Sequence, residues 1–246
     1  MKKLILTLSL VLSSLFATDL NIGVGPYIQT QPYKGADPII VPSPVVFYDN
    51  GVVYARWTRL GVYFLGAKEK DFSWGFSLTA QPRPNGYSPD DSPYLKGLDE
   101  KKTSFEGGLA FTIYGDGKYL EAMLVTDLLD RYNAYIAKVE TGFKYKLGNF
   151  TFYPNVVLVY ESKKFTRYYY GISSDEAART SYEVYQPNGG LRVAAQTYIN
   201  YPLYKSWELF FDLRADRLTN PAKDSPIVSD SFIYSGIAAI MYKFEI

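Results

Sequence analysis

The sequence contains no cysteine and no histidine among its 246 residues. Without cysteine, no disulfide stabilises the chain in an oxidising compartment, and no thiol acts as a nucleophile or a soft metal ligand. Without histidine, mechanisms that need a histidine general base or a Ser-His pair are excluded. A zinc site would need carboxylates alone, which is uncommon. Stability must therefore come from backbone pairing and burial.

Signatures of nucleotide binding and hydrolysis are also missing, since we find no G-x-S-x-G, no P-loop and no G-x-G-x-x-G. Asp90 and Asp91 form an acidic pair in a Pro- and Ser-rich stretch. Calcium usually needs six or more oxygen ligands, so a solvated loop pair is the better interpretation. The sequence predicts a protein that is not an enzyme and holds no cofactor and no metal.

Concentrated positive charge is absent as well. The 26 basic residues are balanced by 25 acidic ones, for a net charge of +1. Binding to phosphate backbones needs clustered Lys and Arg, so we expect no nucleic-acid partner.

The N-terminus has the pattern of a secretory signal peptide. Lys2 and Lys3 precede an apolar run that ends near Ala17, after which polar residues begin. We assign residues 1–17 to this peptide and 18–246 to one exported domain. After residue 17, no run of about 20 apolar residues provides a membrane-spanning helix.

Alternation with a period of two recurs along the rest of the chain, which holds 24 tyrosines and 15 phenylalanines. In residues 135–147 the odd positions are mostly apolar or aromatic, whereas the even positions include Lys138, Glu140 and Lys144. Such segments are β-strands with one apolar face. No segment shows a helical period.

Short and long connections alternate between these segments. Tight turns are predicted at 49–51, 115–117 and 147–149, and long polar loops at 31–42, 81–101, 163–188 and 220–230. We predict twelve strands, or ten if the pieces around residues 58–60 form one bent strand: 19–29, 43–49, 51–57, 60–66, 71–80, 102–114, 118–127, 134–147, 150–161, 189–200, 205–218 and 231–246. Long loops at one end and tight turns at the other are typical of an antiparallel outer-membrane β-barrel.

A soluble sandwich or lipocalin-like barrel shows the same alternation, so the direction of each face must be argued separately. Charges of both signs lie on the polar faces in mid-strand, where a closed barrel can pair them inside its lumen: Glu106, Glu121, Lys138, Glu140, Lys144, Arg192, Asp212 and Arg214. Aromatic residues gather near strand ends, as in a membrane girdle. The last strand, which contains Tyr242 and Phe244, closes the barrel. These features favour lipid outside and a polar lumen inside.

Three stretches of the chain resemble the MipA/OmpV family of outer-membrane proteins. The first has Tyr168-Tyr169-Tyr170-Gly171-Ile172-Ser173, followed by Glu176-Ala177 and Tyr185. The second is Leu95-Lys96-Gly97-Leu98-Asp99, and the third has Asp224, Ser225 and Pro226 before a final strand with Tyr242 and Phe244. One departure is that Glu245 and Ile246 follow the terminal aromatic residue.

The resemblance implies an integral outer-membrane barrel, in contact with membrane lipid and inserted by the barrel assembly machinery. It further implies a scaffold that brings a periplasmic lytic transglycosylase and a murein synthase together. Other family members look like porins or adhesins, so a narrow pore for small solutes is the alternative. We expect Tyr168, Tyr169 and Tyr170 to form an outer aromatic rim that leads into the longest loop, and we expect this loop to fold back into the lumen; a ligand-binding aromatic cluster is the alternative.

Overall fold

The computed structural model describes residues 19–69 and 71–245. The predicted signal peptide therefore lies outside the described residues. The strands are β1 (Asp19–Gln29), β2 (Ile39–Asp49), β3 (Val53–Arg56), β4 (Arg59–Lys68), β5 (Phe72–Arg83), β6 (Ser104–Gly115), β7 (Lys118–Asp127), β8 (Tyr135–Phe143), β9 (Tyr145–Leu147), β10 (Phe150–Glu161), β11 (Gly190–Tyr204), β12 (Trp207–Arg217) and β13 (Phe232–Glu245).

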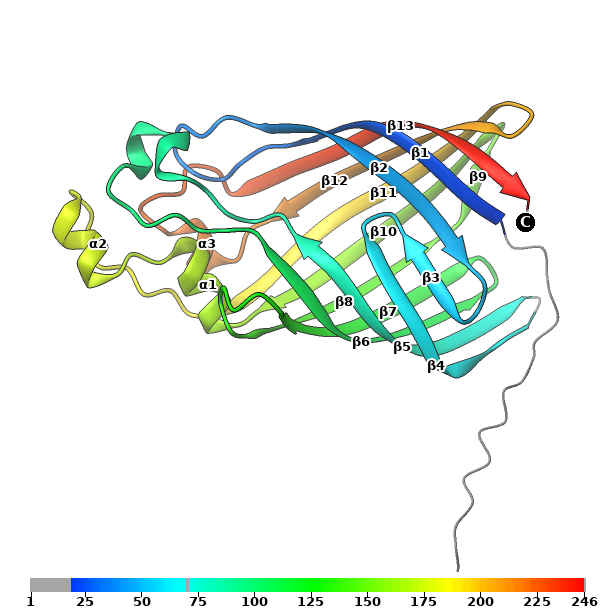
Figure 1. The fold of residues 1–246 in the computed structure, drawn as a ribbon, viewed down its shortest axis with the longest axis horizontal. Coiled ribbons are helices and arrows are strands. Elements are labelled where there is room, and N and C mark those ends of the chain that lie inside the picture. The colour runs from blue at the N-terminus through cyan, green and yellow to red at the C-terminus, as the bar shows by residue number, and fades with distance from the viewer. Residues whose placement is uncertain (1–18, 70, 246) are drawn as a thin grey trace, which may run out of the picture.

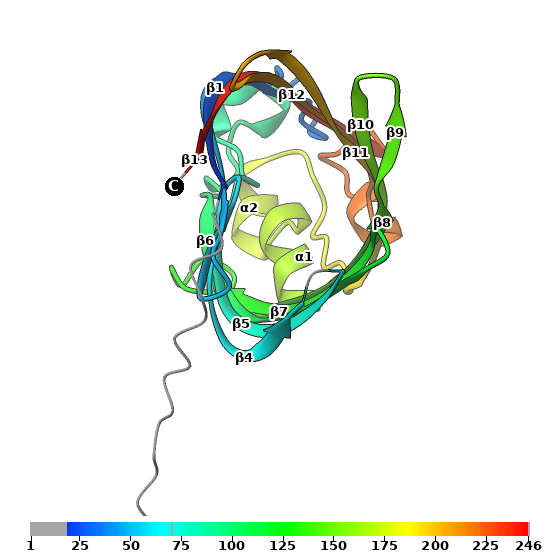
Figure 2. The same cartoon turned by 90° about the vertical axis from the view of Figure 1, so that its right-hand side faces the viewer.

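These strands form one closed antiparallel barrel (Figures 1 and 2). Strand β9 continues β8 past a break at Lys144, and both pair with β10, so the wall has the twelve predicted strands. The C-terminal strand β13 pairs with β1, where Phe244 lies opposite Leu20. The predicted closure by the last strand is confirmed, and it removes the open edges that lipid does not tolerate.

Side chains alternate between the two sides of the wall as the sequence pattern predicts. Leu109 and Leu124 project outward and are 50% and 52% exposed, whereas Glu106 and Glu121 project inward and are 0% and 4% exposed. A soluble barrel would have the opposite arrangement, with apolar residues inside. The apolar surface therefore faces lipid and the polar one faces the lumen.

The long connections at one end contain helices, which corrects the prediction that no helical segment exists. They are α1 (Lys163–Tyr170), α2 (Ser174–Arg179) and α3 (Asn220–Lys223), with the 3-10 turns η1 (Pro89–Asp91) and η2 (Pro93–Leu95). None of the helices in residues 19–69 and 71–245 is long and apolar enough to span a bilayer.

One tight turn lies on the side of the long loops, so the strict separation of loops and turns is wrong at that point. Strand β3 has only four residues, and it turns back into β4 at Trp57 and Thr58. Strand β3 pairs antiparallel with both β2 and β4, so β3 and β4 are two separate strands of the wall, and the ten-stranded alternative is wrong.

Candidate functional site

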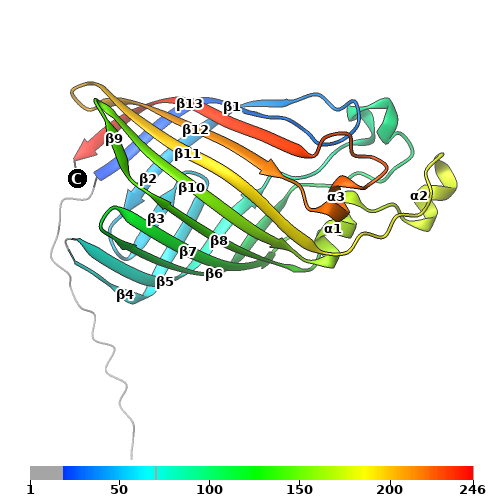
Figure 3. The same cartoon turned by 180° about the vertical axis from the view of Figure 1, so that it is seen from behind.

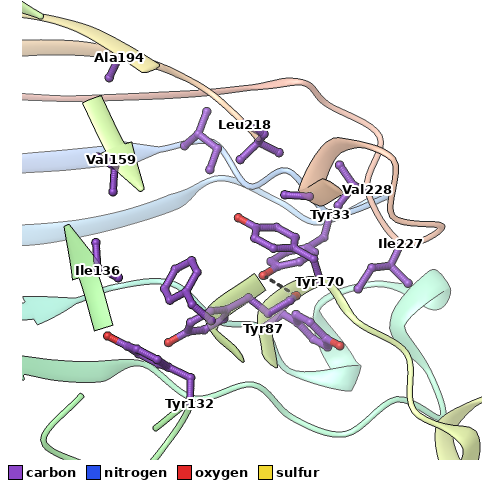
Figure 4. Packing of buried hydrophobic residues seen from close by; sticks show 14 of the residues in the cluster. Tyr33, Tyr87, Tyr132, Ile136, Val159, Tyr170, Ala194, Leu218, Ile227 and Val228 are labelled. Carbon is purple, nitrogen blue, oxygen red and sulfur yellow. Dashed lines mark hydrogen bonds between the residues drawn. The ribbon is translucent and has the colours of Figure 1, made fainter. Parts of the chain in front are cut away.

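The long loops fold into the outer end of the barrel and form a plug, seen end-on in Figure 2. We use the word plug for α1 with residues 171–172, and for residues 30–37, 86–102, 128–134 and 218–230, which pack together. Its core holds Tyr33, Tyr87, Leu95, Leu98, Tyr132, Phe165, Tyr169, Tyr170, Ile172, Leu218, Ala222, Ile227 and Val228, all buried. Figure 4 shows tyrosines of the plug packed beside Ile227 and Val228, with Ile136, Val159 and Ala194 on the surrounding strands. The outer mouth is therefore filled by side chains.

Helix α1 explains the run of three tyrosines. On a helix, positions separated by three or four residues share a face, and the buried residues of α1 are Phe165, Thr166, Tyr169 and Tyr170. The predicted outer aromatic rim is wrong for these tyrosines, because they point into the plug instead of toward lipid. Gly171 ends the helix, and a Cβ atom there would overlap the carbonyl oxygen of Arg167.

The sequence motifs that resemble the MipA/OmpV family meet in this plug. Ser225 Oγ donates a 2.7 Å hydrogen bond to the carbonyl oxygen of Tyr170, and Tyr33 OH donates one of 3.3 Å to that of Tyr169. Asp224 is exposed beside Ser225, and Pro226 is half-buried. Segments that are far apart in sequence thus contribute to one packed unit.

Helix α2 is attached to the second motif by Glu176, which is 2% exposed. Its carboxylate accepts hydrogen bonds from Asp99 N (3.0 Å), Lys101 Nζ (2.9 Å) and Ser173 N (2.8 Å). Burial raises the pKa of Glu176, but these donors outweigh it and lower the pKa to about 2. Ser173 Oγ accepts from Glu176 N and completes a capping box. Ala177 follows in the same helix, half-buried against the core.

Below the plug, buried charges are paired across neighbouring strands. Glu106 accepts two hydrogen bonds from Arg83, at 2.7 and 2.8 Å, and a third from Tyr132 OH at 2.6 Å. Paired and hydrogen-bonded in this way, a carboxylate tolerates complete burial.

A second group of charges lies on β10, β11 and β12. Arg192 Nε is 3.0 Å from Glu161 Oε1, but its N–H is not directed at the carboxylate, so the two groups form an ion pair without a hydrogen bond. Arg214 donates to both oxygens of Asp216 at 2.6 and 2.7 Å. Asp212, which is buried, accepts from Gln196 Nε2 at 2.9 Å.

A third network occupies the lumen nearer the tight turns and attaches the β3–β4 hairpin to strand β7. Glu121 accepts hydrogen bonds from Arg59 and from Arg56 Nη1. Lys138 Nζ lies 2.7 Å from Glu140 Oε2, and Tyr119 OH donates to Glu140 Oε1 at 2.6 Å. Mixed charges therefore cross-link the lumen instead of lining an empty channel.

The residues that the sequence assigned to the lumen lie in these networks, with one difference. Lys144 is exposed at the break between β8 and β9, and its backbone N–H donates to Gly117 O at 2.7 Å. Sequence reasoning missed several partners of the assigned charges: Arg56, Arg59, Arg83, Glu161 and Asp216. All of them occupy inward-facing positions near a strand end. Arg56, Glu161 and Asp216 lie inside the predicted strands, where the alternation alone could have found them, whereas Arg59 and Arg83 lie just outside the predicted bounds.

Groups that carry catalysis are few in this arrangement. Within the described residues, no cluster of three or more His, Cys, Asp or Glu side chains is placed to hold a metal ion. The carboxylates of the lumen are engaged by Arg, Lys, Tyr or Gln, as described above. The interior of the barrel is therefore filled by paired polar side chains.

The fold and its filled interior define an integral protein of the bacterial outer membrane, a twelve-stranded β-barrel with a plugged outer mouth. The model of the family "MltA-interacting protein MipA" matches residues 22–244, and the chain belongs to this family.

Individual relatives agree with this assignment. The chain is 27% identical over 226 residues to the MltA-interacting protein of Escherichia coli (strain K12), covering 91% of this chain and 90% of the relative. It is 24% identical to the putative outer membrane protein YiaT of the same organism, covering 95% and 94%. Among solved structures, the translocator domain of the autotransporter NalP from Neisseria meningitidis has a TM-score of 0.44 at 10% identity, covering 93% and 89%.

Proposed function

We propose that this protein is a non-enzymatic scaffold of the outer membrane that holds cell-wall enzymes at its periplasmic end. The observation that carries the proposal is the plug, whose aromatic core and buried hydrogen bonds fill the outer mouth. A barrel closed in this way is suited to binding partners at its other end better than to passing solutes. The name of the E. coli relative, an MltA-interacting protein, supports a partner of the lytic transglycosylase type.

The periplasmic end offers a surface for such a partner. Hairpins β9–β10 and β11–β12 project beyond the neighbouring strands at the end where β1 begins and β13 ends (Figure 3). Their tips expose Tyr145, Leu147 and Tyr204, which are 52%, 58% and 68% exposed, beside Lys146 and Lys205. Exposed aromatic and apolar side chains with basic neighbours are features of a protein-binding surface.

A photo-crosslinking amino acid at Tyr204 tests the scaffold proposal. We expect Tyr204→p-benzoylphenylalanine to capture a lytic transglycosylase or a murein synthase in intact cells. Tyr94 is a matched control, because it is also an exposed tyrosine (56%) but lies in the loops of the outer end. Absence of either enzyme from the Tyr204 adducts, or equal capture at Tyr94, would contradict the proposal.

The second candidate function is a narrow pore, which the width of a twelve-stranded wall favours. Twelve strands enclose a lumen wider than the filled eight-stranded barrels but narrower than the sixteen-stranded porins. Refolded protein in a planar bilayer distinguishes the two candidates. Steady single-channel conductance would put the pore ahead of the scaffold, and a heat-modifiable protein without conductance would leave the scaffold in place.

A further inference from the structure

The wall of the barrel is incomplete beside the short β3–β4 hairpin. Strand β2 pairs with β3 only through Phe47, Tyr48 and Asp49, after which Trp57 N donates to Val46 O at 2.7 Å. On the other side, β5 pairs with β4 only as far as Ala80. Residues 39–45 of β2 and 81–83 of β5 therefore have no strand between them (Figure 1).

We call this region the wall window. Its lower border is the turn at Trp57 and Thr58, and its sides are residues 39–45 of β2 and 81–83 of β5. Its upper border is formed by the plug, where Ser92 Oγ donates a 2.6 Å hydrogen bond to Lys34 O. The wall window lies in the half of the barrel near the outer mouth.

The sequence of β2 is adapted to an unpaired edge. The carbonyl of Val46 accepts from the hairpin, and every second residue of a strand directs its backbone N–H and C=O to the same side. The backbone groups of Pro44, Pro42 and Ile40 therefore point toward the wall window. Proline has no N–H group, and in sheets it is confined to edges and bulges. Only Ile40 therefore brings a backbone donor that lipid would leave unsatisfied. The same prolines prevent another strand from pairing there, so the wall window is not the place of a missing strand.

Behind the wall window, the interior is apolar. The side chain of Trp57 lies inside, with its ring 5.7 Å from that of Tyr27 and 6.4 Å from that of Phe210. Its Nε1 donates to Ser43 Oγ at 3.2 Å, and its φ of 57° is in the left-handed region that few tryptophans occupy. Local strain of this kind marks positions that the surrounding structure holds in place.

An inward residue of β2 is exposed at the level of the wall window. Val41 and Val45 lie on the same inward face of β2, but Val41 is 44% exposed and Val45 is fully buried. Two arginines beside the wall window are paired with carboxylates: Arg59 with Glu121 and Arg83 with Glu106.

An apolar hollow of about 490 Å³ lies on the hairpin just below the wall window. Its outward lining comes from the apolar faces of four strands: Tyr48, Val53, Ala55, Leu60, Val62, Leu78 and Ala80. The hollow is directly adjacent to the bilayer, because these side chains belong to the lipid-facing surface.

We propose that the wall window admits the alkyl chain of a surrounding membrane lipid, which lies in the hollow and reaches over the turn at Trp57 and Thr58 to the ring of Trp57. The occupant is an alkyl chain because the outward residues of the border are apolar, namely Ile40, Pro42, Pro44 and Pro82, and because the border offers almost no backbone donors and faces the bilayer. The inference does not depend on the scaffold proposal, since the hairpin tips are at the opposite end of the barrel.

Photo-crosslinking in native outer membranes tests this proposal. We expect Trp57→p-benzoylphenylalanine to yield a lipid adduct by mass spectrometry. The outward-facing Ile40→p-benzoylphenylalanine gives the positive control. Tyr119 is the matched negative control, because it is an inward, half-buried aromatic residue on β7, which is paired on both sides.

Lipid adducts at Ile40 and Trp57 but not at Tyr119 would support the wall window. Adducts at Ile40 alone would show that it is closed, and equal adducts at Trp57 and Tyr119 would show that lipid enters elsewhere; either result overturns the proposal. Heat-modifiable migration verifies the fold of each variant. If the Trp57 variant does not fold, Val41→p-benzoylphenylalanine makes the same test from the neighbouring inward position.

Discussion

Replacing Tyr170 tests whether the plug is a cooperative, docked unit. The ring of Tyr170 is completely buried and lies 6.0 Å from that of Tyr33. Truncating a buried aromatic side chain to alanine costs about 3 kcal/mol or more, because apolar contacts are lost and a cavity remains. Tyr170→Ala should therefore favour opening of the plug by about 3 kcal/mol, which raises the open population by about 150-fold.

Trypsin provides the assay, because α1 contains Lys163, Lys164 and Arg167. Cleavage within a helix requires local unfolding, and its rate follows the open population when closing is fast. We expect cleavage of the folded barrel at these sites to accelerate by about two orders of magnitude in Tyr170→Ala. Peptide mass spectrometry identifies the cleaved bond.

Tyr170→Phe is the matched control. The Tyr170 hydroxyl is buried without a hydrogen-bond partner among the described residues, so its removal leaves no other group unpaired. We expect no acceleration of cleavage, because removing a buried hydroxyl that lacks a partner does not destabilise the folded plug. Equal rates for Tyr170→Ala and wild type would refute the docked plug, and strong acceleration by Tyr170→Phe would refute the packing argument.

Other substitutions test the plug and the lumen separately. The pKa of Glu176 is depressed to about 2, so the stabilisation of α2 by this carboxylate is present above about pH 4.5 and lost as the pH falls toward 2. In wild type, pepsin cleavage near α2 should therefore accelerate as the pH falls through this range. In Glu176→Gln this acceleration should be absent, because the side chain has no charge to lose. Glu121→Gln leaves Arg56 and Arg59 without their carboxylate and should reduce the free energy of unfolding by about 3 kcal/mol. Urea titrations followed by tryptophan fluorescence measure this change. Lys144→Ala is the control, because this lysine is exposed and its loss should change the free energy of unfolding by less than about 0.5 kcal/mol. Gly171→Val should increase trypsin cleavage of α1 but retain heat-modifiable migration, because Gly171 lies in the plug and outside the wall.

The barrel wall could be predicted from sequence because its constraint is local. Each strand must present apolar residues to lipid and polar ones to the lumen, so a period of two appears in every spanning segment. Glu106, Glu121 and Glu140 could be assigned to the interior in this way, without knowledge of their partners. The partner of each carboxylate could not be predicted, since pairing across strands depends on register.

The packing inside the plug could not be predicted, because its contacts join distant loops. The hydrogen bond between Ser225 and Tyr170 joins residues 55 positions apart in the sequence, and the one between Tyr33 and Tyr169 joins residues 136 positions apart. Local signals were nevertheless present. Ser173 and Glu176 have the spacing of a capping box, and Phe165 and Tyr169 are four residues apart, as on one face of a helix. The three tyrosines were assigned to an aromatic rim at the start of a long loop because the segments before them were strands.

The plug and the wall window together limit how molecules reach this lumen. Since the outer mouth is filled by an aromatic core, access is left to the periplasmic mouth and to the side of the wall beside Trp57. The networks of Glu121 and Glu140 occupy the lumen between these two entrances. An alkyl chain that enters at Trp57 would have to break buried ion pairs to continue toward the periplasm, which is costly. The wall window is therefore a place where lipid is held, and contact with lipid there is compatible with partner binding at the hairpin tips.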